Sequence, residues 1–281
     1  MTEQGRAKKE RLFLHRCRNL NGGLEAFLES LGLPGQIGER NRILLKPNLV
    51  TDSPPPVTTP VELVCAVVRF LRKRLPEKEI IIGEGCGASE YETSRPFRVL
   101  GYERLAAEEG IRLLDLNHAP QVRFRRSDCR RFPEMFLPEI LSSCFLLSLP
   151  VLKAHSFSEV TLTLKNMMGL VSPVHYTAGS WKKSAFHHRL DEAILDLNRY
   201  RQPDFTLLDA RSGLRDFHLG GRLLEPAPGI LVAGRDPVAV DAMGARLLKR
   251  NPRKIGHIAQ SDGVLGWIDP SEIIETGECF S

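Results

Sequence analysis

The feature of this chain that most restricts its fold is a series of short apolar runs rich in Ile, Val and Leu, separated by segments with helical periodicity. Runs of this length and continuity are typical of strands that are buried on both faces, as in a parallel sheet. The alternation predicts an α/β fold with a mainly parallel sheet and helices on both faces, a three-layer arrangement. The seven runs are "RLFLHRC", "RILLKPN", "EIIIGEG", "IRLLDLN", "CFLLSLP", "FTLLDA" and "GILVAG".

Helix signals are clearest in the segment "TTPVELVCAVVRFLRKRL". Thr59 is the expected N-cap, Pro60 the first helical residue, and Glu62 completes a capping box. In "DPVAVDAMGARLLKR", Asp236 is the expected N-cap before Pro237. Two further helices are predicted in "FRVLGYERLAAEEG", which ends at a glycine, and in "FHHRLDEAILDLNRY".

Length and composition favour one folded domain. A chain of 281 residues fits one large domain or two modest ones. Because no linker or internal repeat divides it, we expect a single α/β domain over 1–281, with two lobes as the alternative. Two segments, 128–141 and 172–187, interrupt the alternation and predict an inserted loop or small subdomain. We expect the second to be a functional loop or lid, because it is too long and mixed for an ordinary turn.

No window approaches the roughly 18 consecutive apolar residues that a membrane span requires. The N-terminal segment is polar and charged, so we expect a cytoplasmic protein with no membrane partner. A net charge of +5 favours acidic ligands only weakly. In the arginine-rich segments "RFLRKRLP" and "VRFRRSDCRR" the aromatic residues are not interleaved in a recognisable RNA- or DNA-binding pattern, so nucleic acid is not an expected partner. A homo-oligomer is compatible with the sequence.

The six cysteines stand at positions 17, 65, 86, 129, 144 and 279. They form no Cys-x-x-Cys pair and no spacing suited to zinc, so we expect reduced thiols and no iron-sulfur cluster. Cys86 lies in the Gly-rich segment "GEGCGAS", where a thiol nucleophile is the alternative to a buried thiol.

Polar side chains follow five consecutive predicted strands. In open parallel sheets the ligand binds outside the carboxyl ends of the strands. These residues therefore predict a shared polar cleft, although exposed loop ends are polar in any protein. They are Lys46 and Asn48, Glu84, Asn117 and His118, Lys153 and His155, and Asp209.

Lys46 is a candidate anion-binding residue. Thr58 and Thr59 precede the next helix, whose unpaired amides and positive dipole end favour a carboxylate or phosphate. The alternative is that Lys46 only extends its charged end from a strand into solvent. No Walker-type or G-x-G-x-x-G motif supports nucleotide binding.

His155 and Lys153 are candidate catalytic residues. On an extended strand both side chains point to the same side, and the lysine charge lowers the imidazole pKa, which favours a neutral, proton-accepting ring. Lys153 alternatively stabilises an oxyanion. Glu84, between two glycines, is the candidate partner for proton transfer or a metal ligand. The alternatives are a histidine bonded to backbone and a carboxylate that only forms a turn.

Lys165 and Asn166 lie in "TLTLKNMMG" beside apolar residues. A buried unpaired lysine is costly, so we expect a carboxylate or the ligand as its partner. His187 or its neighbour His188 adds a second imidazole, and at most one of them faces the cleft.

Asp241 lies in the apolar stripe of its predicted helix. We expect it to pair with Lys165, with another cation or with a divalent metal. Together with Glu84 and Asp209 it would offer the oxygen ligands that magnesium or manganese prefers.

These motifs, in this order, resemble the domain of unknown function family 362. The resemblance rests on "KPNLV", "TTP", "IIIGEG", "LPVLKAHSFSEVTLTLKNMMG", "LLDA" and "AGRDPVAVDAMGA", and it extends over 42–266. It implies a cytoplasmic α/β protein without a settled reaction. Many relatives carry a ferredoxin-like cysteine segment that this sequence lacks, which puts a cluster here in doubt. A looser similarity to nickel-dependent lactate racemases implies proton or hydride chemistry on a small carboxylate.

The function favoured by these observations is an enzyme that acts on a small anionic metabolite, bearing carboxylate or phosphate, by acid/base or redox chemistry. In this hypothesis Lys46 and Lys165 hold the anion. A non-catalytic ligand-binding or redox-accessory protein is the alternative, and nucleic-acid binding is the third hypothesis.

Overall fold

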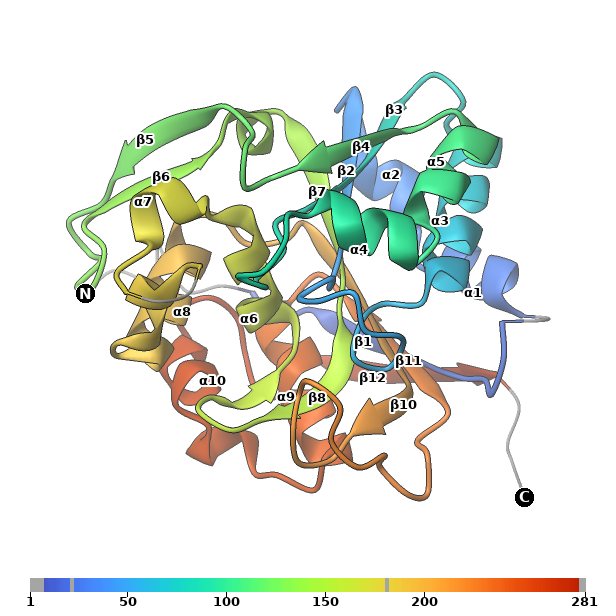
Figure 1. Ribbon diagram of the computed structural model, residues 1–281. Helices are drawn as coiled ribbons and strands as arrows, with labels where there is room; N and C mark the ends of the chain where they lie inside the picture. Colours follow the sequence, from blue (N-terminus) through green and yellow to red (C-terminus); the bar gives the residue numbers. More distant parts are fainter. Residues whose placement is uncertain (1–7, 21–22, 180–181, 278–281) are drawn as a thin grey trace.

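The computed structural model describes residues 8–20, 23–179 and 182–277, and its centre is a sheet with the strand order β12-β1-β11-β10-β7-β2-β3-β4 (Figure 1). Each of the seven predicted runs forms a strand of this sheet. These seven strands are β1 (Arg11–Arg16), β2 (Arg42–Pro47), β3 (Glu79–Glu84), β4 (Arg112–Asp115), β7 (Cys144–Leu149), β10 (Phe205–Leu214) and β11 (Ile230–Gly234), and β12 (Glu272–Gly277) is added at the edge.

The sheet is mainly parallel, as predicted. Strands β4, β3, β2, β7 and β10 run parallel, and β12 runs parallel to β1. Strand β11 is antiparallel to both of its neighbours. The prediction did not include β12, because this edge strand is largely exposed and its sequence "EIIETG" mixes charged and apolar residues. After β7, the chain continues into β8 (Val151–His155), which pairs with β10 and with β9 (Glu159–Thr161).

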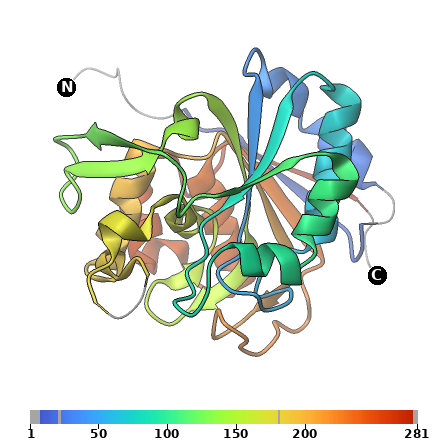
Figure 2. The same cartoon turned by 45° about the horizontal axis from the view of Figure 1, so that its top comes forward.

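Helices cover both faces of the sheet, which confirms the α/β fold (Figures 1 and 2). Alternate residues of a strand pack in two hydrophobic cores, one on each face of the sheet. In β2, Leu44 packs in one core, and Ile43 and Leu45 pack in the other. The first core contains residues of α6 (Thr163–Asn166), α7 (Pro173–Tyr176), α8 (Leu190–Tyr200), α9 (Pro237–Leu247) and α10 (Gly256–Ser261). The second contains residues of α1 (Leu24–Ser30), α2 (Leu33–Ile37), α3 (Val61–Arg74), α4 (Ser94–Val99) and α5 (Tyr102–Glu109).

The predicted capping box of α3 is wrong. The N-cap is Pro60, without a side-chain hydrogen bond, and the helix begins at Val61. Thr59 is engaged elsewhere, because its hydroxyl donates to the Leu149 carbonyl oxygen at 2.6 Å and accepts from the Asn48 backbone N–H at 2.8 Å. Thr59 therefore joins the ends of β2 and β7.

Two other helix ends follow the prediction. The Asp236 carboxylate caps α9 by accepting the backbone N–H groups of Val238 at 2.8 Å and Ala239 at 3.2 Å. Gly110 follows α5 with a φ of 58°, the left-handed conformation that glycine adopts easily. The predicted helix before it is interrupted at Gly101, whose φ of 84° separates α4 from α5.

The two segments that break the alternation have their own local structure. Within 128–141, strand β6 (Glu134–Pro138) pairs with β5 (Gln121–Arg125) as a separate two-stranded sheet, followed by the short helix η1 (Glu139–Ser142). Segment 172–187 contains α7 and the short helix η3 (Ser184–His187), while positions 180 and 181 lie outside the described residues. Among the described helices, none has both the length and the apolar character needed to cross a bilayer.

The order of the strands indicates where a ligand would bind. From β2 the chain moves outward through β3 to β4, whereas from β7, the direct neighbour of β2, it moves to β10 on the opposite side. Two adjacent parallel strands whose connections leave in opposite directions form a topological switch point, with a crevice at their carboxyl ends. Lys46 and Asn48 lie at the end of β2, and Lys153 and His155 lie in β8, directly after β7, so these four predicted residues are at this switch point.

Candidate functional site

A cavity of about 490 Å³ lies at the carboxyl ends of β2, β3 and β8. Its volume is in the range of small-molecule sites. Its walls also include residues of α6, of segment 172–187 and of the segment after β10. Seven of the predicted site residues line it: Asn48, Glu84, Lys153, His155, Lys165, Asn166 and His187.

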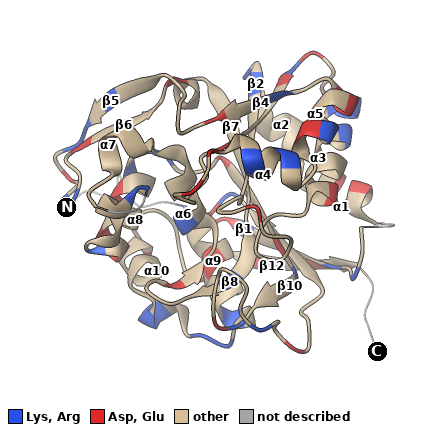
Figure 3. Cartoon of the chain, viewed as in Figure 1, with Lys and Arg blue, Asp and Glu red and all other residues tan. Residues whose placement is uncertain are grey.

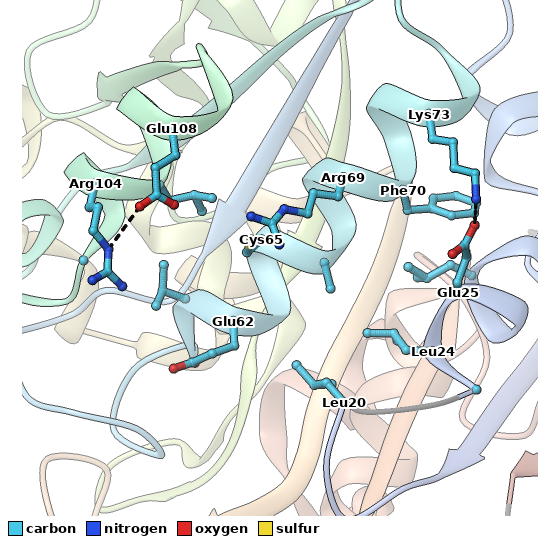
Figure 4. Close-up of a pocket in the computed structure, with 16 residues that line it drawn as sticks. Leu20, Leu24, Glu25, Glu62, Cys65, Arg69, Phe70, Lys73, Arg104 and Glu108 are labelled. Carbon is cyan, nitrogen blue, oxygen red and sulfur yellow. Dashed lines mark hydrogen bonds and ion pairs between the residues drawn. The ribbon is translucent and has the colours of Figure 1, made fainter.

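A larger cavity, of about 770 Å³, lies between α1, α3 and α5, away from the strand ends (Figure 4). Figure 4 shows Lys73 beside Glu25 and Arg104 beside Glu108, at 2.6 Å and 3.6 Å. These charges are exposed and already paired. We therefore take the cavity at the strand ends as the candidate site.

Lys46 and Glu84 form a buried ion pair beside the cavity, with Nζ 2.8 Å from Oε1. Glu84 also accepts the backbone N–H groups of Gly85 and Leu49, at 2.8 Å and 3.1 Å. Burial lowers the pKa of Lys46, and the Glu84 charge opposes that shift. The predicted anion-binding role of Lys46 does not fit this geometry, because its ammonium already has a carboxylate partner and joins β2 to β3.

A chain of amide contacts extends from this ion pair. Asn166 Oδ1 accepts from Lys46 Nζ at 3.4 Å and from Asn48 Nδ2 at 3.0 Å. Asn48 Oδ1 in turn accepts from Lys153 Nζ at 2.8 Å, and the Val57 carbonyl oxygen accepts from the same ammonium at 2.6 Å. The network links β2, β3, α6 and β8, so it holds the floor of the cavity in one arrangement.

Gly169, in the short helix η2 (Met167–Leu170), packs directly on the ion pair. A Cβ at this position would overlap Glu84 Oε1 and lie 2.5 Å from Lys46 Nζ. We expect Gly169→Ala to lower the free energy of unfolding by about 1–3 kcal/mol, the range for inserting a methyl group into a packed core. Chemical denaturation measures the change. Gly35→Ala is the control, because no atom lies within 4 Å of its added Cβ, and an equal loss in both variants would contradict the prediction.

Lys165 extends from α6 into the cavity. Among the residues that the structure describes, its ammonium has no hydrogen-bond or ion-pair partner. Burial lowers its pKa to about 8. No carboxylate of the described chain therefore pairs with Lys165. Of its two expected partners, only a ligand remains.

Among the described residues, Asp241 neither pairs with Lys165 nor belongs to a group of metal-ligating side chains. It is fully buried on α9 and accepts the backbone N–H groups of Thr163 at 2.7 Å and Leu164 at 3.0 Å. Burial raises its pKa to about 7, and these two hydrogen bonds oppose that shift. Asp241 thus anchors the first turn of the helix that carries Lys165, which corrects the predicted metal role.

The predicted oxygen ligands are not brought together. Asp209 forms a two-point ion pair with Arg211, at 2.6 Å and 3.0 Å, and does not line the cavity. Within the described ranges, the group of three suitable ligands within 4.8 Å of one another is Glu92, Asp115 and His118, which is mostly exposed. Glu84, Asp209 and Asp241 are not such a group, so they do not assemble the expected magnesium site.

His155 lines the cavity, and hydrogen bonds from the backbone fix the tautomer of its ring. Its Nδ1 accepts the backbone N–H groups of Phe157 at 3.0 Å and Ser158 at 3.2 Å. Burial, and then the charge of Lys165, lower its pKa to about 2, so the ring is neutral near pH 7. Because Nδ1 accepts, the proton is on Nε2. The neutral ring was expected, but its other nitrogen, Nε2, carries the proton, so this tautomer does not fit the predicted base role.

The remaining predicted residues are divided between cavity and framework. His187 lines the cavity, whereas His188 is exposed, which settles which of the pair faces the ligand space. Thr58 is buried and donates to the Ser53 carbonyl oxygen at 2.6 Å. Thr58 and Thr59 both lie outside the cavity lining, so they stabilise the loop before α3 instead of binding a ligand.

Sequence reasoning missed two lysines and one histidine that line the cavity. Lys183 donates to the Gly85 carbonyl oxygen at 2.7 Å, and burial lowers its pKa to about 7. Lys182 and His218 also line the cavity. Both lysines belong to the predicted functional segment 172–187. His218 lies after β10, which continues to Leu214, beyond the predicted run "FTLLDA". Cys86, by contrast, is buried with its pKa raised to about 11 by burial, so it is not an activated thiol.

Two comparisons place this chain among known proteins. Residues 43–246 match the model of the domain of unknown function DUF362. The chain is 26% identical over 258 residues to the "Thylakoid-associated protein sll1697" of Synechocystis sp., which covers 87% of this chain and 74% of that protein. The description of the family names no reaction.

Proposed function

The chain belongs to the DUF362 family, and we propose that it is an enzyme acting on a small anion that bears a carboxylate or phosphate group. The observation that carries the proposal is the ammonium of Lys165, which extends into a ligand-sized cavity without a counter-charge in the described chain. An anionic ligand group would supply the missing partner in a site where a charge-assisted hydrogen bond is strong.

The surrounding charges support an anion over a cation. Lys153 and Lys183 are buried at the cavity wall and donate to neutral amide and carbonyl oxygens. The acidic residues of the wall are Glu84, which is paired with Lys46, and Glu90, which is exposed. The cavity therefore has an excess of positive charge when its lysines are protonated.

The acid/base chemistry rests on Lys153 in this proposal. Burial, and then the charge of Lys165, lower its pKa to about 7, close to the pH at which a general acid or base works best. His155 Nε2 donates a hydrogen bond to the ligand, and Lys165 holds the anionic group. Glu84 keeps the cavity floor in place through its three donors.

The affinity for anions should fall as the pH rises through about 8, because Lys165 loses its charge there. We expect a decrease of about tenfold per pH unit above that point. Titration calorimetry with acetate, whose own charge is constant above pH 6, measures this dependence.

In the free protein the lowered pKa of Lys165 has the opposite effect on stability. The folded state binds fewer protons than the unfolded state between pH 8 and the ordinary value of 10.5, so this group makes stability rise with pH. Lys165→Met should lose the binding slope and reduce the stability slope, of which the part due to Lys153 and Lys183 remains.

A panel of carboxylates and phosphate monoesters tests the function. Binding that requires Lys165, together with turnover that is lost in Lys153→Met, supports the enzyme. Binding without turnover of any compound favours the alternative, a non-catalytic ligand-binding or redox-accessory protein. His155→Ala separates the two further, because an enzyme loses rate and a binding protein loses only affinity.

Nucleic-acid binding remains the third hypothesis, and the surface charges do not favour it. In the arginine-rich segments, Arg69 pairs with Glu109 at 2.7 Å and Arg125 pairs with Glu134 at 2.9 Å. Figure 3 shows basic and acidic segments interspersed in this view. Retention on DNA or RNA that weakens steeply with salt would support this hypothesis.

The cytoplasmic location stays a prediction. Thylakoid association is part of the printed name of the Synechocystis relative and describes that protein. Fractionation of cells, with detection of this chain in the membrane and supernatant fractions, tests the location.

A further inference from the structure

Three large apolar side chains are exposed at the cavity although they belong to its lining. The exposed fractions are 79% for Phe157, 44% for Phe217 and 41% for Leu219. Phe157 lies between β8 and β9, and the other two lie in the segment after β10. We call these three residues the apolar rim. Single exposed apolar residues are common, but a group beside one cavity indicates a binding surface.

The polar groups of the same cavity lie deeper. Lys153 and His155 are buried, with exposed fractions of 0% and 4%, and Lys165 is only partly exposed. The cavity therefore changes character with depth, from cationic donors at the floor to hydrocarbon at the mouth. A ligand complementary to both parts carries an anionic group at one end and an apolar group at the other.

Four aromatic rings connect the two parts. The ring of Phe157 lies 6.0 Å from that of His155, which stacks on His218 with 4.0 Å between centroids. The ring of Phe217 lies 5.0 Å from that of His218. The two histidines stand between the exposed phenylalanines, so this wall offers continuous ring surface from the mouth inward.

We infer that the ligand is an amphipathic anion, with its carboxylate or phosphate at Lys165 and an apolar group along the ring wall and the apolar rim. The inference rests on the proposed function, because it requires an anion at Lys165. It narrows the proposed class of substrate to amphipathic anions, because a hydrophilic anion such as acetate or inorganic phosphate fills only the floor of the cavity. The cavity of about 490 Å³ has room for a longer molecule.

Straight-chain carboxylates from acetate to octanoate test the inference on the full chain. Titration calorimetry gives the affinities, and the weakest ligands are measured by displacement. Each methylene group that leaves water should strengthen binding by up to about fourfold. In the double variant Phe157→Ser, Phe217→Ser this dependence on chain length should be largely lost, while the affinity for acetate stays within about twofold of the parent value.

Phe124→Ser is the matched control, because Phe124 is an exposed aromatic residue outside the cavity lining. It should keep the full dependence on chain length. Equal affinities for acetate and octanoate in the parent protein would overturn the inference and leave the proposed function standing. An unchanged chain-length dependence in the double variant would also overturn it. If neither a carboxylate nor phosphate binds at all, the proposed function fails as well.

Discussion

Replacing Lys46 by methionine should lower the free energy of unfolding by about 3–5 kcal/mol, the range for removing one partner of a buried ion pair. For a chain of this size the loss corresponds to a decrease of roughly 6–20 °C in melting temperature. The reason is that Glu84 would keep its charge in a buried position with two backbone amides but without its ion-pair partner. Thermal and denaturant unfolding of the purified variant measure the effect.

The double variant Lys46→Met, Glu84→Gln is the control for this prediction. It removes both charges, so it should be more stable than the sum of the single changes implies. A loss below about 1 kcal/mol in Lys46→Met, combined with loss of anion binding, would contradict the structural role. It would instead support the anion-binding role that the sequence first indicated.

The strands were predictable because their signal is local. Each of the seven apolar runs is continuous over a few residues, and burial on both faces of a sheet requires that pattern. The position of the cavity followed from the same signal, because polar residues at the ends of parallel strands meet at one edge. Asn48, Glu84, Lys153 and His155 were brought together in this way.

The roles of individual residues were not predictable, because they depend on partners far away in the sequence. Lys46 and Lys165 are equivalent as sequence features, yet within the described part of the chain only Lys46 has a carboxylate partner, 38 positions further along. Asp241 was expected to meet a cation, but two backbone amides of α6 occupy its oxygens. The neighbouring Lys153 predicts a neutral, proton-accepting ring for His155, but no sequence pattern reports that Nδ1 accepts two backbone N–H groups.

Replacing Lys165 by methionine should weaken anion binding by about tenfold to 150-fold, the equivalent of 1.5–3 kcal/mol for a hydrogen bond to a charged group. The melting temperature should stay the same or rise, because the change removes an ammonium without a partner in the described chain from a site where burial lowers its pKa. Titration calorimetry with a short carboxylate and thermal unfolding without ligand measure the two quantities.

The two lysine variants should therefore separate stability from binding. Lys254→Met controls for the change in net charge, because Lys254 is exposed and outside the cavity, and it should alter neither quantity. If Lys165→Met lowers the melting temperature as strongly as Lys46→Met while anions bind with unchanged affinity, then Lys165 is a structural cation. Selection of an anion would then depend on Lys153 and Lys183, whose ammonium groups both already donate to protein oxygens.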